Sequence, residues 1–209
     1  MITLTELKAS EKNPGRWYAS FSDGGRLRVN TALIADFSLY AEKEMEEGEY
    51  EALKTASEKE TAKARALNIL GNRSLSRFEI KDRIIKKGES EETAEEAAAW
   101  LERAGLINDF EYARTLCRHY AGKGYGVMKI RDELYRRGVP REYWKEAFSE
   151  IPEPEETLDA LIARKLRGKT PDKKELDSLR NYLRRRGFSW EEIKAAISRL
   201  DIAAEDDYE

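Results

Sequence analysis

The chain has 209 residues, of which 38 are Lys or Arg and 41 are Asp or Glu, giving a net charge of −3. This balance excludes a globally basic nucleic-acid-binding protein as the simple interpretation. Charged residues make up 38% of the chain against an ordinary ~25%, which favours helices with solvated faces. With 40% hydrophobic residues, the chain is too apolar to be disordered.

The charge is unevenly distributed along the chain. Residues 1–61 hold 8 basic and 12 acidic residues, whereas residues 162–200 hold 12 basic and 5 acidic residues. The single cysteine, Cys117, excludes an intramolecular disulfide and is typical of a reducing compartment. Because no 18-residue apolar run and no signal-peptide core are present, we expect a cytoplasmic protein without a membrane segment.

The first thirty residues differ from the rest of the chain. Residues 2–7 alternate roughly between apolar and polar, and residues 17–29 read as two strands around the turn Ser22-Asp-Gly-Gly. The pattern predicts a small β-meander of three strands. An acidic helical stretch is expected to follow and to end at Gly48, since glycine commonly stops a helix.

Three glycines end similar segments: Gly88, Gly138 and Gly187 each follow two basic residues and lie 50 and 49 residues apart. Apolar residues stand eight and four positions before each glycine, namely Ile80 and Ile84, Ile130 and Leu134, and Leu179 and Leu183. Apolar residues six, ten and thirteen positions after each glycine mark one face of a further helix. The spacing predicts a three-helix unit that occurs three times and stacks into a continuous core.

We therefore predict a mainly α fold, with three tandem three-helix (helix-turn-helix-like) repeats forming an elongated curved solenoid behind a small N-terminal β-meander. The expected boundaries are residues 1–48 for the β-rich extension with a short helix, 49–107, 108–152 and 153–201 for the repeats, and 202–209 for an acidic tail. Helix starts are expected after Ser76, Ser90 and Ser189, with Pro140 in a first helical turn.

No enzyme site emerges from the sequence, and no catalytic, cofactor-binding or metal-binding residue is predicted. The only histidine, His119, lies two residues from Cys117 on a helix, where the two side chains point to different faces. The glycine-rich run from Gly122 to Gly126 lacks the spacing of a phosphate-binding loop. It is better explained as a connection between two helices, which could also expose Lys123 and Tyr125 as a contact loop.

The basic residues of the second helices are the main candidates for a contact surface. Two interpretations remain open: solvated faces whose last-turn cations complement the helix dipole, or a stripe that binds a polyanion or an acidic protein surface. The candidate contact residues are Arg77, Lys81, Lys86 and Lys87 in repeat one, Lys129, Arg131, Arg136 and Arg137 in repeat two, and Arg180, Arg184, Arg185 and Arg186 in repeat three, together with Lys123 and Tyr125.

Four stretches in the right order resemble the RecX family, the regulators of RecA recombinase. They are residues 66–88, with Arg73-Ser-Leu-Ser-Arg-Phe-Glu-Ile; residues 105–114, with Gly105-Leu-Ile-Asn-Asp-Phe-Glu-Tyr; the run Gly124-Tyr-Gly-Val-Met-Lys-Ile-Arg-Asp-Glu-Leu-Tyr-Arg-Arg-Gly-Val; and Leu183-Arg-Arg-Arg-Gly-Phe-Ser-Trp. The resemblance covers about residues 60–200, and residues 1–60 lie outside the family's common core.

The resemblance implies a non-enzymatic regulator without a cofactor that binds the RecA nucleoprotein filament on single-stranded DNA. It implies inhibition of the ATPase, recombination and coprotease activities of that filament, and hence a role in homologous recombination, DNA repair and the SOS response. We expect a monomer with no membrane partner. Two alternatives stay open: direct binding of single- or double-stranded DNA by helix-turn-helix-like modules, and a helical adaptor for another acidic protein.

Overall fold

The computed structural model describes residues 1–71 and 73–206, with side chains described up to residue 200. The chain forms two compact units, Met1–Ile107 and Asn108–Glu209. Within the described residues the fold is mainly helical, with antiparallel strands at the N-terminus, as predicted. Of the predicted acidic tail, the side chains of residues 202–206 and all of residues 207–209 lie outside the described part of the chain.

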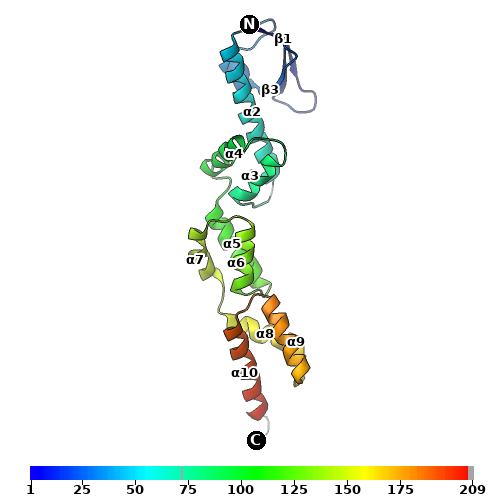
Figure 1. Cartoon of the computed structure of the whole chain (residues 1–209), viewed down its shortest axis with the longest axis vertical. Helices are drawn as coiled ribbons and strands as arrows, with labels where there is room; N and C mark the ends of the chain where they lie inside the picture. Colours follow the sequence, from blue (N-terminus) through cyan, green and yellow to red (C-terminus); the bar gives the residue numbers. More distant parts are fainter. Residues whose placement is uncertain (72, 207–209) are drawn as a thin grey trace. The chain divides into compact units, whose positions relative to one another are not determined.

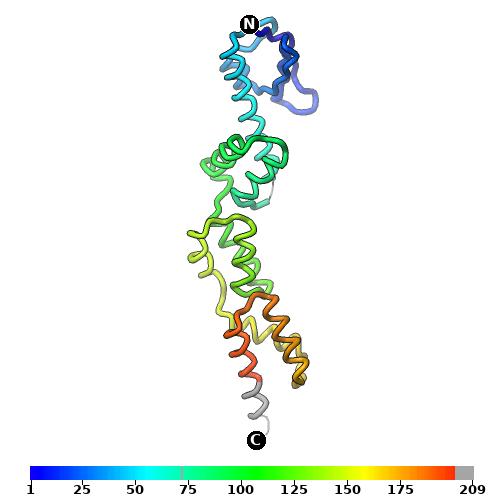
Figure 2. Tube along the Cα trace, viewed as in Figure 1, coloured from blue at the N-terminus to red at the C-terminus, as the bar shows by residue number. Residues whose placement is uncertain are grey.

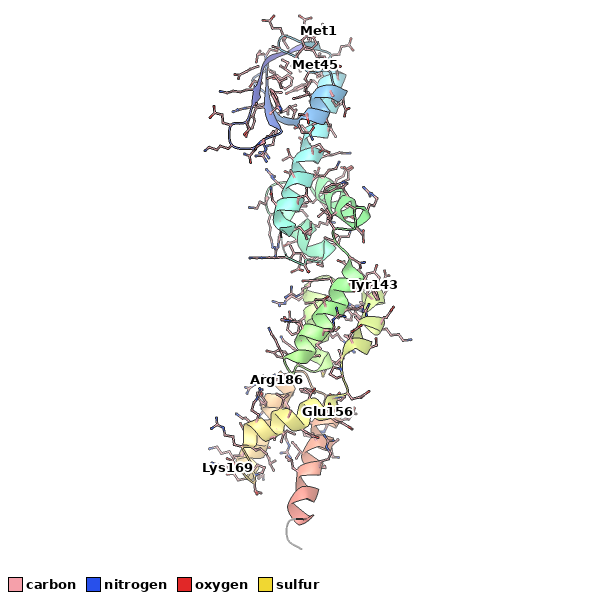
Figure 3. The ribbon with its side chains drawn as sticks, turned by 180° about the vertical axis from the view of Figure 1, so that it is seen from behind. Met1, Met45, Tyr143, Glu156, Lys169 and Arg186 are labelled. Atoms are coloured by element: carbon pink, nitrogen blue, oxygen red, sulfur yellow. The ribbon has the colours of Figure 1, made fainter. Side chains whose placement is uncertain are left out.

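The first unit begins with an antiparallel sheet of strand order β3-β2-β1-β4. Its strands are β1 (Ile2–Ala9), β2 (Arg16–Phe21), β3 (Arg26–Asn30) and β4 (Glu44–Met45). The predicted meander of three strands is confirmed in β1 to β3, and a fourth strand that the sequence did not predict pairs with β1. The fourth strand pairs Ile2 with Met45, close to Met1 in Figure 3, and at two residues it is too short to show a strand periodicity in the sequence.

The helical stretch predicted to end at Gly48 is also different in the structure. Only α1 (Thr31–Asp36) forms before that glycine, and Gly48 lies in the first turn of the long helix α2 (Glu47–Leu70). The N-terminal part of α2 packs on the sheet through Tyr50 and Leu53, and its C-terminal part enters the core of repeat one (Figure 1). One helix therefore serves both the sheet and the first repeat.

Repeat one is completed by α3 (Arg77–Ile85) and α4 (Glu91–Arg103). The helix start predicted after Ser76 is confirmed and has a capping box: the Ser76 hydroxyl accepts from the backbone N–H of Glu79, and the Glu79 carboxylate accepts from that of Ser76. Ser90 caps α4 in the same way by accepting from the N–H of Thr93. The buried core contains the residues that the repeat spacing selected: Ile80, Ile84, Ala94, Ala98 and Leu101.

Repeat two begins with α5 (Asp109–Gly122) and α6 (Val127–Arg136), joined by the glycine-rich run as predicted. The continuous third helix predicted after Gly138 is wrong. It is divided into η1 (Arg141–Tyr143), α7 (Trp144–Ala147) and η2 (Phe148–Glu150), and Pro140 precedes η1 instead of standing inside its first turn. Trp144 Nε1 donates to the carbonyl of Val139 at 3.0 Å, which holds this irregular segment against the end of α6.

Repeat three consists of α8 (Pro154–Leu166), α9 (Lys173–Arg185) and α10 (Trp190–Asp206), traced from yellow to red at the C-terminal end of Figure 2. Its buried cluster includes Leu158, Ile162, Leu179 and Leu183. Repeats two and three have separate clusters of buried residues, so the continuous core predicted from stacking is wrong within this unit. Another feature must join these two repeats.

Candidate functional site

The cations of α3 in repeat one are paired with carboxylates of the neighbouring helix α4. Arg77 forms ion pairs with Glu95 and, at 2.9 Å, with Glu102. Lys81 lies 3.1 Å from both Glu91 and Glu95. Hydrogen bonds from Lys81 and Arg77 hold the pKa of Glu95 below its ordinary value, against the opposing effect of burial. The acidic side chains of α4 therefore neutralise half of the candidate cations of this repeat.

The remaining candidates of repeat one stand near the end of α3. Lys86 pairs with Asp82 of its own helix at 2.7 Å, as expected for an exposed i, i+4 pair. Lys87 is exposed and has no ion partner among the described side chains. Repeat one thus presents one unpaired candidate cation in the described part of the chain.

A buried carboxylate contacts three of the four candidate cations of α6, whereas the fourth, Arg131, is exposed and lies 5.9 Å from the centre of the Phe148 ring. Glu133 is 6% exposed and is approached by Lys129 at 3.5 Å, by Arg136, and by Arg137 at 3.7 Å. Burial alone would raise the pKa of Glu133, but hydrogen bonds from Arg136 and Tyr120 and the charges of Arg136 and Lys129 bring that pKa below its ordinary value. Sequence reasoning missed Glu133, although it stands four residues from both Lys129 and Arg137.

Arg186 does not extend into solvent with the other arginines of repeat three. Its guanidinium donates to the carbonyls of Lys123 at 2.8 Å and Gly124 at 3.0 Å. It also lies 5.1 Å from the ring centres of both Tyr125 and Tyr182. Arg186 and the Lys123–Tyr125 loop, predicted as contact residues, therefore join repeat two to repeat three.

The backbone completes this junction. The N–H of Gly126 donates to the carbonyl of Arg186 at 2.9 Å, and the N–H of Met128 donates to that of Gly187 at 3.1 Å. These carbonyls replace a side-chain cap, which α6 lacks. A Cβ atom on Gly126 would lie 2.4 Å from the Gly187 carbonyl oxygen, and one on Gly187 would lie 2.3 Å from the Lys129 nitrogen. Only glycine fits on either side of the contact.

The two ends of α9 carry exposed cations without ion partners among the described side chains. We call Lys173, Lys174, Arg184 and Arg185 the α9 basic surface. They lie on the solvent side of the helix, opposite the buried Leu179 and Leu183, and the two ends are about 16 Å apart at the ordinary helical rise. The fourth candidate of this repeat, Arg180, pairs with Asp177 at 2.8 Å and is not part of the surface.

The position of Lys173 and Lys174 cannot be explained by helix stability. The N-terminus of a helix carries partial positive charge, so cations in the first turn are unfavourable. The capping box of Asp172 and Glu175 already satisfies the helix start. Arg184 and Arg185, by contrast, stand in the last turn, where the helix dipole favours cations. The first-turn lysines therefore favour a contact role over a purely structural one.

Further cations stand beside this surface in the connection between α8 and α9. Arg167 and Lys169 are exposed there, and neither has an ion partner among the described side chains. Figure 3 shows Lys169 and Arg186 at opposite ends of the α8–α9 hairpin. The surface is therefore extended at the hairpin end that lies away from the repeat junction.

The cysteine and histidine form no joint site. Cys117 is fully buried, and burial raises the pKa of its thiol to about 11, while His119 is exposed. The two side chains point to different faces of α5, as predicted. In residues 1–71 and 73–200, no group of three His, Cys, Asp or Glu side chains is arranged to hold a metal ion, and no helix of the described chain is long and apolar enough to cross a bilayer.

Protein-family models match all three helical repeats. The model of the first RecX three-helix domain matches residues 62–101, that of the second matches residues 108–147, and that of the third matches residues 153–197. These matches bracket the cores and the glycine turns described above.

Individual relatives and solved structures agree with these matches. Regulatory protein RecX of Vibrio vulnificus is 31% identical over 140 residues, covering 66% of this chain and 92% of the relative. That of Chlorobium limicola is 35% identical over 147 residues, covering 68% and 91%. A crystal structure of regulatory protein RecX matches with a TM-score of 0.73 at 20% identity; the match covers 95% of this chain and all of that one. The crystal structure of RecX from Lactobacillus salivarius matches with a TM-score of 0.63 at 22% identity and covers 70% of this chain and 99% of that one.

Proposed function

Because this chain belongs to the RecX family, whose named relatives are regulatory proteins, we propose that it regulates RecA by binding the RecA filament on single-stranded DNA. The proposed effect is inhibition of the filament's ATPase, recombination and coprotease activities. The α9 basic surface is the proposed contact.

The observation that supports this proposal is the unequal pairing of the candidate cations. Carboxylates of α4 and the buried Glu133 occupy most cations of repeats one and two, whereas Lys173, Lys174, Arg184 and Arg185 have no described ion partner. An unpaired cation loses less on binding an anion, since no internal ion pair has to be broken. Of the three repeats, repeat three therefore has the most cations available for an anionic partner.

A protein–DNA filament fits this charge distribution better than naked DNA. The whole chain has a net charge of −3, so its acidic segments offset part of the attraction between the α9 basic surface and DNA alone. A filament offers protein surface for the neutral and acidic regions and phosphates or carboxylates for α9. Direct DNA binding by the helical repeats remains the second candidate function, since α9 is a basic helix of a helix-turn-helix-like unit.

Co-sedimentation with RecA filaments assembled on single-stranded DNA tests the proposal. We expect the wild-type chain to pellet with the filament and to slow its ATP hydrolysis and strand exchange. Lys173→Glu with Lys174→Glu should weaken this binding roughly tenfold or more, because charges at the contact are reversed. The folded state should tolerate the change, since acidic residues are favourable in a first helical turn.

The matched control reverses two exposed lysines of the same unit, Lys145→Glu with Lys194→Glu, and should pellet like the wild type. Failure of the wild-type chain to pellet or to alter either rate would overturn the proposed function. Tight binding to naked duplex DNA, lost in the α9 variant and steeply dependent on salt, would favour the second candidate instead.

A further inference from the structure

One face of the sheet in the first unit points away from the buried cluster that the sheet forms with α1 and α2. Ala19 and Val29 belong to the buried cluster that also contains Leu33 of α1 and Leu53 of α2. Neighbouring residues of a strand point to opposite faces, and cross-strand partners share a face. Tyr18, which pairs with Lys8 on one side and Arg28 on the other, therefore belongs to the outer face.

Four cations lie on this outer face. Lys8, Tyr18 and Arg28 form one row across the sheet, and Arg16 and Arg26 flank it at positions two residues from Tyr18 and Arg28. None of Lys8, Arg16, Arg26 and Arg28 has an ion partner among the described side chains. We call these four cations with Tyr18 the outer sheet face.

The acidic composition of residues 1–61 gives no indication of this basic surface. The region has a net charge of −4, but most of its carboxylates lie in loops and in α2, and Glu6 is the one acidic residue of the three-strand part of the outer face. Four like charges gathered around one carboxylate repel one another. An anionic ligand would relieve that repulsion.

Aromatic groups accompany the cations at both ends of the surface. The Arg26 guanidinium lies 4.4 Å from the centre of the Tyr18 ring, forming a stack against which a planar base can pack. Arg16 and Arg28 line a cavity of about 450 Å³, whose other walls include Glu60, Lys63, Leu67 and Trp100. The buried Nε of Arg28 has no hydrogen-bond partner, so this arginine is not fully satisfied within the protein.

We propose that the outer sheet face binds single-stranded nucleic acid, with phosphates on Lys8, Arg16 and Arg28 and a base on the Tyr18–Arg26 stack. The cavity beside Trp100 accepts a neighbouring base. Unpaired cations interleaved with aromatic rings are what such a ligand requires, because the strand exposes both its phosphates and the flat faces of its bases. An acidic protein segment would use the cations but would leave the aromatic stack without a role.

The proposal does not rest on the proposed function, and its test contains no RecA. The full chain is titrated with a fluorescein-labelled oligo(dT) at several salt concentrations, and binding is followed by fluorescence anisotropy. Arg16→Gln with Arg28→Gln should weaken binding and lower the slope of log affinity against log salt by about 1.4, since each single-strand phosphate contact contributes about 0.7. The matched control, Lys54→Gln with Lys59→Gln, removes two cations of α2 that are paired with Glu51 and Glu96, and it should keep the wild-type affinity and slope.

A second variant separates stacking from charge. Tyr18→Leu should weaken oligo(dT) binding roughly tenfold with an unchanged salt slope, because it removes the stack and leaves every cation in place. Equal affinity of the wild type and the Arg16/Arg28 variant, with both shown to be folded by circular dichroism, would overturn the proposal. So would a polyglutamate peptide that binds as tightly as oligo(dT) and is insensitive to Tyr18→Leu, which would identify an acidic protein partner. Filament co-sedimentation of the same variants keeps this result distinct from failure of the proposed function.

Discussion

Repeats one and three have the same three-helix design but use their basic residues in opposite ways. In repeat one, Arg77 and Lys81 face the carboxylates of α4, so the second and third helices neutralise each other. In repeat three, Lys173 and Lys174 occupy the first turn of the equivalent second helix and have no described ion partner. Both repeats thus have a basic second helix, and the carboxylates of the neighbouring helix determine whether its cations are available to a partner.

The glycine turns show the same contrast. Gly88 and Gly187 end equivalent helices with φ of +93° and +89°, a conformation that glycine adopts most readily. A Cβ atom on Gly88 would meet nothing within 4 Å, whereas one on Gly187 would overlap the backbone of Lys129. The turn of repeat one ends a helix, and the turn of repeat three also holds repeat two.

Substitution of the two glycines should give the largest difference. Gly187→Ala is expected to destabilise the second unit by about 3 kcal/mol or more, because backbone strain adds to a backbone overlap. Gly88→Ala should cost the first unit about 1–2 kcal/mol, the strain of the left-handed conformation alone. Urea unfolding of the full chain, followed by circular dichroism, measures both. Equal losses for the two variants would contradict the assignment of Gly187 to an inter-repeat contact.

Two adjacent arginines allow a sharper form of the comparison. Arg186→Gln should cost the second unit about 2 kcal/mol, because it removes the hydrogen bonds to the carbonyls of Lys123 and Gly124 and the contacts with two tyrosine rings. Arg185→Gln removes the same charge from an exposed position and should change stability by less than about 0.5 kcal/mol.

For filament binding we expect the larger effect from Arg185→Gln and the smaller effect from Arg186→Gln, the reverse of their effects on stability. Arg185→Gln should weaken co-sedimentation at a temperature where both variants are folded, and Arg186→Gln should leave it nearly unchanged. Thermal unfolding followed by co-sedimentation gives both quantities from the same preparations. If the two variants behave alike in both measurements, the division between a junction arginine and a contact arginine is wrong.

The sequence was informative where a physical signal is local. The capping box at Ser76, the glycine turns and the apolar positions such as Ile130 and Leu134 follow from periodicity and spacing within one helix. The availability of a cation could not be predicted in this way. Arg184 and Arg186 stand two residues apart in one basic run, yet only the folded chain shows that Arg186 turns toward Lys123, 63 residues away.

The same limit applies to the N-terminal region. A net charge over residues 1–61 is a sum, whereas a binding surface depends on which residues share a sheet face. Strand register brings Lys8 and Arg28 into one row, and register was not fixed by the alternation of residues 2–7. The break of the third helix in repeat two could not be predicted from the sequence either. Trp144 and Phe148 have a helical spacing, but the backbone before Trp144 and from Phe148 onward forms 3-10 helix.

Repeat two provides an intermediate case that pH can test. The lowered pKa of Glu133 in the folded state means that its ionised form stabilises the fold fully above its ordinary value of 4.5 and loses this effect as pH falls through the lowered pKa. Glu133→Gln should cost about 1 kcal/mol at neutral pH, a modest value because Arg136 is largely exposed. Urea unfolding between neutral and acid pH should show the gap between wild type and variant closing below pH 4.5. A gap that stays constant would mean that the carboxylate charge is not what stabilises repeat two.

The smallest effect is expected from a substitution that makes the cations of repeat one less strongly paired, as those of repeat three are. Glu95 contacts both Arg77 and Lys81, so Glu95→Gln should remove one of the two carboxylate partners of each cation, leaving Glu102 on Arg77 and Glu91 on Lys81. Glu92→Gln removes the same charge from the same helix at an exposed position without an ion partner among the described side chains. We expect Glu95→Gln to bind heparin, a model polyanion, roughly twofold more tightly than Glu92→Gln, measured at low salt by isothermal titration. Identical affinities would mean that net charge alone governs anion binding and that pairing across α3 and α4 does not restrain the cations of repeat one.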